Sequence, residues 1–242
     1  MFNFYNRLKT IYLYKVFLLG LFLCLSASCS GEKIDTGQVF RMPITNEPPT
    51  LDWSLATDSV SFDILTNIME GLTQYDANMD PIPAIAKRWE ISKNKKIITY
   101  YLRDDVFWTD GKPVTAHDFE YSWKRLLNPA TAAQYAYFLF DVENAHEFNS
   151  GNISDSSLVG VSAKNDHILE VRLKKAVVYF PSITTFMVTF PQRKDIVEKF
   201  GDHWTDPENI VTNGPFKLID WEHEYKLTLN ANENFYEGRP PL

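Results

Sequence analysis

Apolar side chains recur at every third or fourth position in the stretch that follows the loop "TNEPPTLDWS". This spacing places apolar residues on one face of an α-helix. It predicts a helix over Ser59–Met69, with Gly71 where a glycine commonly caps a helix C-terminus. The apolar face of this helix consists of Val60, Ile64, Leu65, Ile68 and Met69.

A second helical stripe begins after the turn "TDG", residues 109–111. Thr115 and Asp118 have the spacing of a capping box, in which each side chain bonds the backbone N–H of the other residue. The apolar residues that follow lie at i, i+4, i+7 and i+8, and Pro129 ends the helix. They are Phe119, Trp123, Leu126 and Leu127.

Strands are predicted where β-branched and aromatic residues gather between turn signals, first at Val39–Ile44 and then at "LTQY" and "IITYYLR". Two hairpins are clearer: "LVGVSA" returns as "ILEVRLK", and "GPFKLIDWEH" returns as "EYKLTLNAN". Further helices are expected over Ala133–Phe148, Pro181–Phe186 and Arg193–Gly201, the last capped by its glycine. Helices mixed with hairpins indicate an α+β fold rather than a doubly wound parallel sheet.

The first 28 residues have the order of a secretory signal: a basic start, the apolar run "VFLLGLFLCL", and small residues before Cys29. The ten-residue run is shorter than a membrane-spanning anchor, which is the alternative. "SASC" also resembles a lipoprotein signal with lipid on Cys29, although Ser26 stands where such signals usually carry Leu. The alternative here is ordinary cleavage that leaves a free thiol. We expect residues 29–37 to be a polar tether.

Charge and composition narrow the classes of partner. The 242-residue chain has 24 Lys and Arg against 31 Asp and Glu, a net charge of −7. Loss of residues 1–28 would remove three basic residues and leave 21 against 31, a net charge of −10. This argues against nucleic acid, because phosphate binding needs a basic face. Cys24 lies within the signal, so the mature chain is expected to have no internal disulfide.

The carboxylates around the second helix are the candidates for catalytic chemistry. Asp110, Asp118 and Glu120 could be imagined as paired acids of a secreted hydrolase. Asp118 and Glu120 stand two apart on a helix and so point to different faces, and Asp118 is needed for the cap. No metal-ligand spacing, nucleophile elbow or P-loop is present, and no metal or cofactor is predicted. The five histidines are scattered: His117, His146, His167, His203 and His223.

The order of several segments resembles the family 5 solute-binding proteins of ABC importers, in particular their oligopeptide-binding branch. These segments are "NEPPTLDWSLATDS", "IMEGLTQYD", "PIPAIAKRWEIS", "AAQYAYFLF", "NIVTNGPFKLIDW" and, most specifically, the run from Leu102 to Pro129. The resemblance covers residues 38–242 and implies the mixed-sheet first lobe of a two-lobed periplasmic-binding-protein-like fold, type II, cluster C. Family members are about twice this length, so we expect a fragment without the second lobe.

The resemblance also implies a function. Such proteins are not enzymes; they close on an extended peptide and present it to a membrane permease served by ATPases. We therefore expect a monomeric substrate-binding lipoprotein in the periplasm or cell envelope, held at the membrane by lipid on Cys29. Within the family a dipeptide, nickel complex, haem, opine or oligosaccharide can replace the oligopeptide. A carboxylate-dependent hydrolase and a truncated envelope protein that binds nothing are the alternatives from other classes.

Three binding residues follow from the resemblance, position by position. Tyr135 in "AAQYAYF" matches a tyrosine that contacts the bound peptide. Thr57 and Ser59 match positions whose backbone runs beside the ligand, and only the backbone role carries over because their side chains differ. A packed aromatic side chain on a helix is the alternative interpretation of Tyr135.

Overall fold

The computed structural model describes residues 39–240. The chain divides into two compact units, and the larger, Met42–Pro241, contains every residue of the hydrophobic core. The elements below belong to that unit. The predicted signal over residues 1–28, Cys29 and the tether over residues 29–37 lie outside the described residues.

The helices and strands alternate irregularly along the chain, which confirms the α+β prediction. In chain order they are α2 (Ser59–Ile68), β1 (Thr73–Tyr75), β2 (Pro81–Pro83), β3 (Ala86–Ile91), β4 (Ile97–Leu102), α3 (Ala116–Leu127), η1 (Pro129–Thr131), η2 (Ala136–Leu139), α4 (Ala145–Asn149), η3 (Ser156–Leu158), β5 (Val161–Asn165), β6 (Ile168–Arg172), α5 (Phe180–Ile183), η4 (Met187–Thr189), α6 (Lys194–Phe200), η5 (Gly201–His203), β7 (Phe216–Glu222) and β8 (Lys226–Ala231).

A four-stranded sheet in the order β3–β4–β6–β5 is the largest sheet of the described residues, and each of its strand pairs is antiparallel. Tyr100 on β4 stands between Trp89 on β3 and Leu169 on β6. Leu169, Val171 and Leu173 are buried while their neighbours are less so, which confirms the predicted alternation of the second hairpin strand. Two separate two-stranded hairpins, β1–β2 and β7–β8, are also antiparallel.

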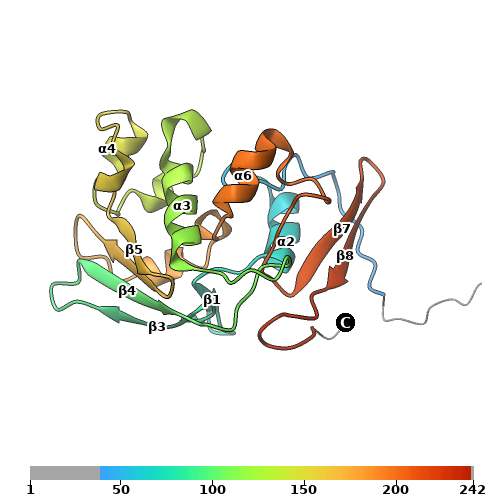
Figure 1. Ribbon diagram of the computed structural model, residues 1–242, viewed down its shortest axis with the longest axis horizontal. Helices are drawn as coiled ribbons and strands as arrows, with labels where there is room; N and C mark the ends of the chain where they lie inside the picture. Colours follow the sequence, from blue (N-terminus) through green and yellow to red (C-terminus); the bar gives the residue numbers. More distant parts are fainter. Residues whose placement is uncertain (1–38, 241–242) are drawn as a thin grey trace, which may run out of the picture. The chain divides into compact units, whose positions relative to one another are not determined.

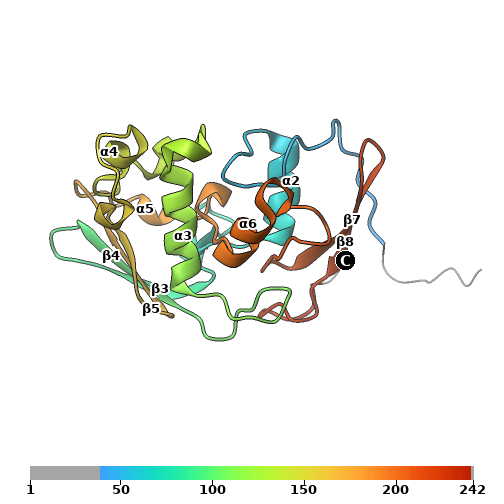
Figure 2. The same cartoon turned by 45° about the horizontal axis from the view of Figure 1, so that its top comes forward.

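Helix α3 packs on β5 and β6, and Figures 1 and 2 show it on one face of the sheet. Its capping box between Thr115 and Asp118 is present as predicted. The predicted apolar stripe is fully buried, and the indole N–H of Trp123 donates a 2.7 Å hydrogen bond to the carbonyl of Thr189. This helix and its preceding turn, where Gly111 has a φ of +85°, therefore act as scaffold.

The predicted helix over Ala133–Phe148 is wrong. The structure has two short segments there, η2 and α4, separated by residues 140–144, of which Asn144 lies in the left-handed region with a φ of 59°. Between them Val142 forms an antiparallel bridge with Leu173, and Glu143 donates its N–H to the carbonyl of Arg172 at 2.9 Å. A continuous helix would break this pairing with the end of β6, which sequence spacing does not reveal.

Two smaller predictions at the start of the domain are also wrong. No strand forms over Val39–Ile44. Helix α2 ends at Ile68 with Met69 as its C-cap in extended conformation, so Gly71 caps nothing. Gly71 is instead needed for close packing, because a Cβ there would lie 2.6 Å from a ring carbon of Phe190.

The remaining predicted elements are confirmed, with small shifts of their ends. The short helix expected over Pro181–Phe186 spans Phe180–Ile183, and α6 ends before Gly201, which has a φ of 54°. The β7–β8 hairpin forms as predicted, with β7 against α2 (Figure 1). Within the described part of the chain, no helix is long and apolar enough to cross a membrane.

Candidate functional site

The loop between the first prolines and α2 is anchored by a buried ion pair. Arg125 on α3 donates from Nη1 to Oδ1 of Asp52 at 2.9 Å and from Nη2 to Oδ2 at 2.6 Å. The indole N–H of Trp204 donates to the same Oδ2 at 3.2 Å. The Asp52 side chain is only 6% exposed, so its charge depends on these donors in place of water.

Further contacts fix the same loop to the second half of the chain. Trp53 packs edge to face on Trp204 with ring centroids 4.8 Å apart, and its indole N–H donates to the carbonyl of Phe190. The side-chain amide of Gln192 donates to the hydroxyl of Ser54 at 3.0 Å. The loop that leads into α2 is therefore fixed by contacts within the domain.

Thr57 and Tyr135, two of the three binding residues expected from the sequence, are in direct contact. The hydroxyl of Tyr135 donates to the carbonyl of Thr57 at 3.3 Å, although the two residues are 78 positions apart. Within residues 39–240 the backbone N–H of Thr57 has no acceptor. Ser59, the third, is the exposed first residue of α2, whose cap Asp58 accepts from the N–H of Ser61.

Four other aromatic rings surround Tyr135. Its ring centroid lies 5.6 Å from that of Phe138, 5.9 Å from that of Tyr137 and 6.0 Å from that of Phe186. Phe62 on α2 is the fourth, at 6.2 Å. Tyr135 is half-buried, so the interpretations as a packed aromatic and as a ligand contact are compatible: one side packs and the remainder is accessible.

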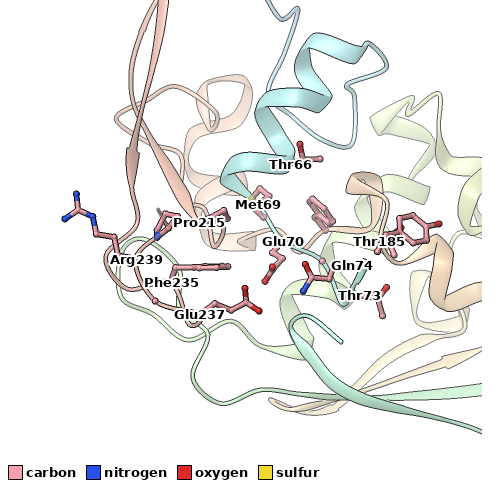
Figure 3. Close-up of a pocket in the computed structure, with 15 residues that line it drawn as sticks. Thr66, Met69, Glu70, Thr73, Gln74, Thr185, Pro215, Phe235, Glu237 and Arg239 are labelled. Carbon is pink, nitrogen blue, oxygen red and sulfur yellow. The ribbon is translucent and has the colours of Figure 1, made fainter. Parts of the chain in front are cut away.

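A separate pocket of about 450 Å³ lies between the end of α2 and the segment after β8 (Figure 3). None of the three expected binding residues lines it. Figure 3 shows the carboxylates of Glu70 and Glu237 turned toward one another. The apolar part of its wall is made by Met69, Phe190, Pro215 and Phe235.

Glu70 has an unusual environment in this pocket. Its Oε2 is buried and, like the hydroxyl of Tyr236, has no hydrogen-bond partner among the described residues. Burial raises the pKa of Glu70 to about 7; the negative charge of Glu237 adds to this effect and the positive charge of Arg103 opposes it. The side-chain amide of Asn213 accepts from the backbone N–H of Glu70 and donates to its carbonyl.

The carboxylates considered for hydrolysis each have a separate structural partner. Asp110 accepts from Arg193 at 2.9 Å, and Glu120 accepts from Lys124 and from the N–H of Ala163. Asp118 accepts from Thr115, and burial raises the pKa of this carboxyl. Each carboxylate is thus engaged in a contact that stabilises the fold, so the structure does not favour the hydrolase hypothesis.

The histidines are likewise separate. His117 lies 3.5 Å from Asp166, His203 lies 3.0 Å from Asp206, and His223 contacts Glu47. Among the described residues no three His, Cys, Asp or Glu side chains come together in a way that could hold a metal ion.

Comparison with known proteins identifies the family. Residues 80–242 match the bacterial extracellular solute-binding proteins, family 5 Middle. The chain belongs to this family. The dipeptide-binding protein DppE of Bacillus subtilis is 37% identical over 212 residues, which are 87% of this chain and 38% of that protein. The periplasmic oligopeptide-binding protein OppA of Salmonella typhimurium is 41% identical over 174 residues, 71% of this chain and 32% of that protein.

A solved family 5 structure agrees with the fold. The substrate-binding domain of an oligopeptide ABC transporter from Bacillus anthracis superposes with a TM-score of 0.79 at 39% identity. The match covers 82% of this chain and 38% of that one. The chain thus spans well under half the length of the family 5 proteins that it matches.

Sequence reasoning missed most of what surrounds the expected binding residues. Asp52 and Arg125 are 73 positions apart, and no local sequence pattern indicates that they pair with each other. The ring cluster had a partial signal, because "YAYF" places three aromatic residues within four positions. Phe62 and Phe186, which complete it, come from other parts of the chain and could not be assigned to it.

Proposed function

We propose that this chain forms one wall of a peptide-binding clamp in a substrate-binding protein of an ABC importer. The whole protein would capture oligopeptides in the cell envelope and deliver them to a membrane permease and its ATPases, without catalysis. Relatives named for dipeptides and oligopeptides support peptides as the ligand class. The short coverage of these relatives supports a second lobe in the complete protein.

The contact between Tyr135 and Thr57 is the observation that carries this proposal. It joins a side chain and a backbone segment that the family resemblance assigns to ligand binding. Within residues 39–240 the N–H of Thr57 has no acceptor. An extended peptide could accept from this N–H and continue along the loop, as in strand addition. Such backbone pairing tolerates many peptide sequences, because every residue of a peptide offers the same groups.

One wall alone is expected to bind weakly. A hydrogen bond made at an open edge competes with water and contributes about 0.5–1.5 kcal/mol. Ordering one residue of a flexible peptide costs about 1–2 kcal/mol. These terms nearly cancel, so tight binding requires a second lobe that covers the other side of the peptide and excludes water.

The proposed location in the cell rests on the segments that precede the folded domain. We infer that residues 1–28 are a signal peptide, that Cys29 receives lipid, and that residues 29–37 tether the folded domain to a membrane. The family is extracellular by its description, which agrees with this order of segments.

Calorimetry with tri- to pentapeptides tests the clamp. Residues 29–242 should bind no peptide at micromolar concentration. A protein that continues from residue 242 into the remaining part of the Salmonella relative, and that melts cooperatively, should bind. Tight binding by residues 29–242 alone, or no binding by the folded two-lobed protein, would contradict the proposal.

A further inference from the structure

Tyr137 is the exposed member of the ring cluster around Tyr135. Its side chain is 53% exposed, while the rings of Phe62, Tyr135, Phe138 and Phe186 are half-buried. Its hydroxyl has no hydrogen-bond partner in the part of the chain that the structure describes. Its ring adjoins the half-buried rings, so the five side chains together form one aromatic patch beside the proposed ligand edge.

The cluster holds Tyr137 in a fixed orientation. Its ring stacks on Phe138 with centroids 4.7 Å apart and planes 25° from parallel. It stands at 89° to the ring of Tyr135, and Phe138 in turn contacts Phe186 at 4.8 Å. Stacked and edge-to-face pairs are the favourable arrangements of aromatic rings, so the outer ring is supported from two sides.

The cluster is also continuous with the proposed binding edge. Tyr135 is its central ring, and the hydroxyl of the same residue donates to the carbonyl of Thr57. A peptide that ran along Thr57 would therefore pass beside Tyr135, around which the other rings of the cluster are grouped. We propose that the cluster is a subsite for an aromatic side chain of the bound peptide, and that Tyr137 determines this preference. This proposal rests on the proposed function.

The surroundings favour an aromatic occupant over a cationic one. Among the described residues, none of the five rings has a Lys or Arg of this chain above it. The nearby carboxylate of Asp58 is engaged by the N–H and the hydroxyl of Ser61. A ligand cation would lose hydration over these rings, whereas an aromatic ring would both pair with the rings and bury apolar surface.

The subsite can be tested without a second lobe. Residues 29–242 contain the whole of the compact unit and its core, and N-acetyl-phenylalaninamide at millimolar concentration serves as the probe. We expect saturable shifts of the backbone amide signals of residues 135–138 in NMR titrations. N-acetyl-alaninamide and N-acetyl-lysinamide should produce weaker shifts.

Variants at one position show whether Tyr137 is responsible. Tyr137→Ser should weaken binding of the phenylalanine probe about 2- to 10-fold, the range of one aromatic pair, while Tyr137→Phe should retain it. Tyr225→Ser is the control, because Tyr225 is 78% exposed on the β7–β8 hairpin and lies outside the cluster. The amide spectrum of each variant reports whether it is folded.

The outcomes separate this proposal from the clamp. Absence of saturable shifts at residues 135–138, equal affinity for the lysine probe, or an unchanged affinity in Tyr137→Ser would each overturn the aromatic subsite. None of these results bears on whether a two-lobed protein captures peptides. Conversely, failure of peptide capture with intact probe binding would reject the clamp and leave an aromatic site on this domain.

Discussion

Arg125 and Asp52 form two parallel hydrogen bonds, at 2.9 and 2.6 Å, that join helix α3 to the loop preceding the proposed ligand edge. Arg125→Ala leaves the Asp52 carboxylate buried without its main donor. Breaking a buried ion pair from one side typically costs about 3–5 kcal/mol. We expect a loss of that size in the free energy of unfolding, measured by urea denaturation.

Lys194→Ala, which removes the cation of an exposed ion pair, is the matched control for Arg125→Ala. Lys194 lies 3.7 Å from Glu198 on α6, and both side chains are more than half exposed. Exposed pairs of this kind contribute about 0.2–1 kcal/mol. Equal effects of the two substitutions would show that the Asp52 pair is open to water and does not anchor the loop.

Truncation of Trp123 tests the scaffold. Its side chain is fully buried on α3 and its indole N–H bonds Thr189. Trp123→Ala removes a large core side chain and leaves a cavity, which typically costs about 3–5 kcal/mol. We expect a large fall in melting temperature, and little change for Tyr225→Ala on the exposed hairpin. A variant that melts like the unaltered protein would place the stripe of α3 at the surface.

The carboxyl of Glu70 should make stability depend on pH. Its pKa rises from 4.5 to about 7 on folding because of burial. Between these values the unfolded chain releases the proton that the folded chain keeps, so the free energy of unfolding falls as the pH rises. The loss is complete above pH 7 and amounts to at most about 3 kcal/mol.

Glu70→Gln keeps the shape of the side chain and removes its charge. We expect this variant to lose the decline in stability between pH 4.5 and 7 and to be the more stable protein at pH 8, as measured by urea denaturation across this range. Glu147→Gln, at an exposed glutamate on α4, should keep the original profile. If Glu70→Gln follows the original profile as well, the Glu70 carboxylate is solvated in the folded protein.

Mass spectrometry of the mature N-terminus tests the proposed anchor. We expect the chain to begin at Cys29 and to carry lipid on that residue. An unmodified Cys29, or an intact Met1, would contradict the lipoprotein proposal without affecting the fold of residues 39–240.

Local signals predicted the scaffold well. The capping box of Thr115 and Asp118 and the buried stripe of α3 depend on residues within a few positions of one another, so spacing alone identifies them. The hairpins were predicted in the same way, from the alternation of apolar and polar residues along their strands. The helix expected over Ala133–Phe148 failed because Val142 is drawn into an extended bridge with Leu173, 31 positions away.

The candidate site was harder to predict from the sequence, because its contacts also join residues that are far apart along the chain. Tyr135 and Thr57 were selected only by resemblance to a family, and their hydrogen bond joins distant parts of the chain. The sequence around Asp52 or Arg125 does not indicate a buried ion pair, because each residue alone is indistinguishable from an ordinary surface charge. Gly71 was misread as a cap, since its real constraint is the ring of Phe190 across the core.

Hydrogen exchange at the Thr57 amide tests the proposed ligand edge. In the folded two-lobed protein, Thr57 should exchange more slowly once a tripeptide saturates the site, because the peptide supplies the acceptor that this N–H lacks among the described residues. The amide of Asn165, at the end of strand β5, should be unaffected. A peptide that binds fully while exchange at Thr57 stays unchanged would show that the ligand does not lie along this edge.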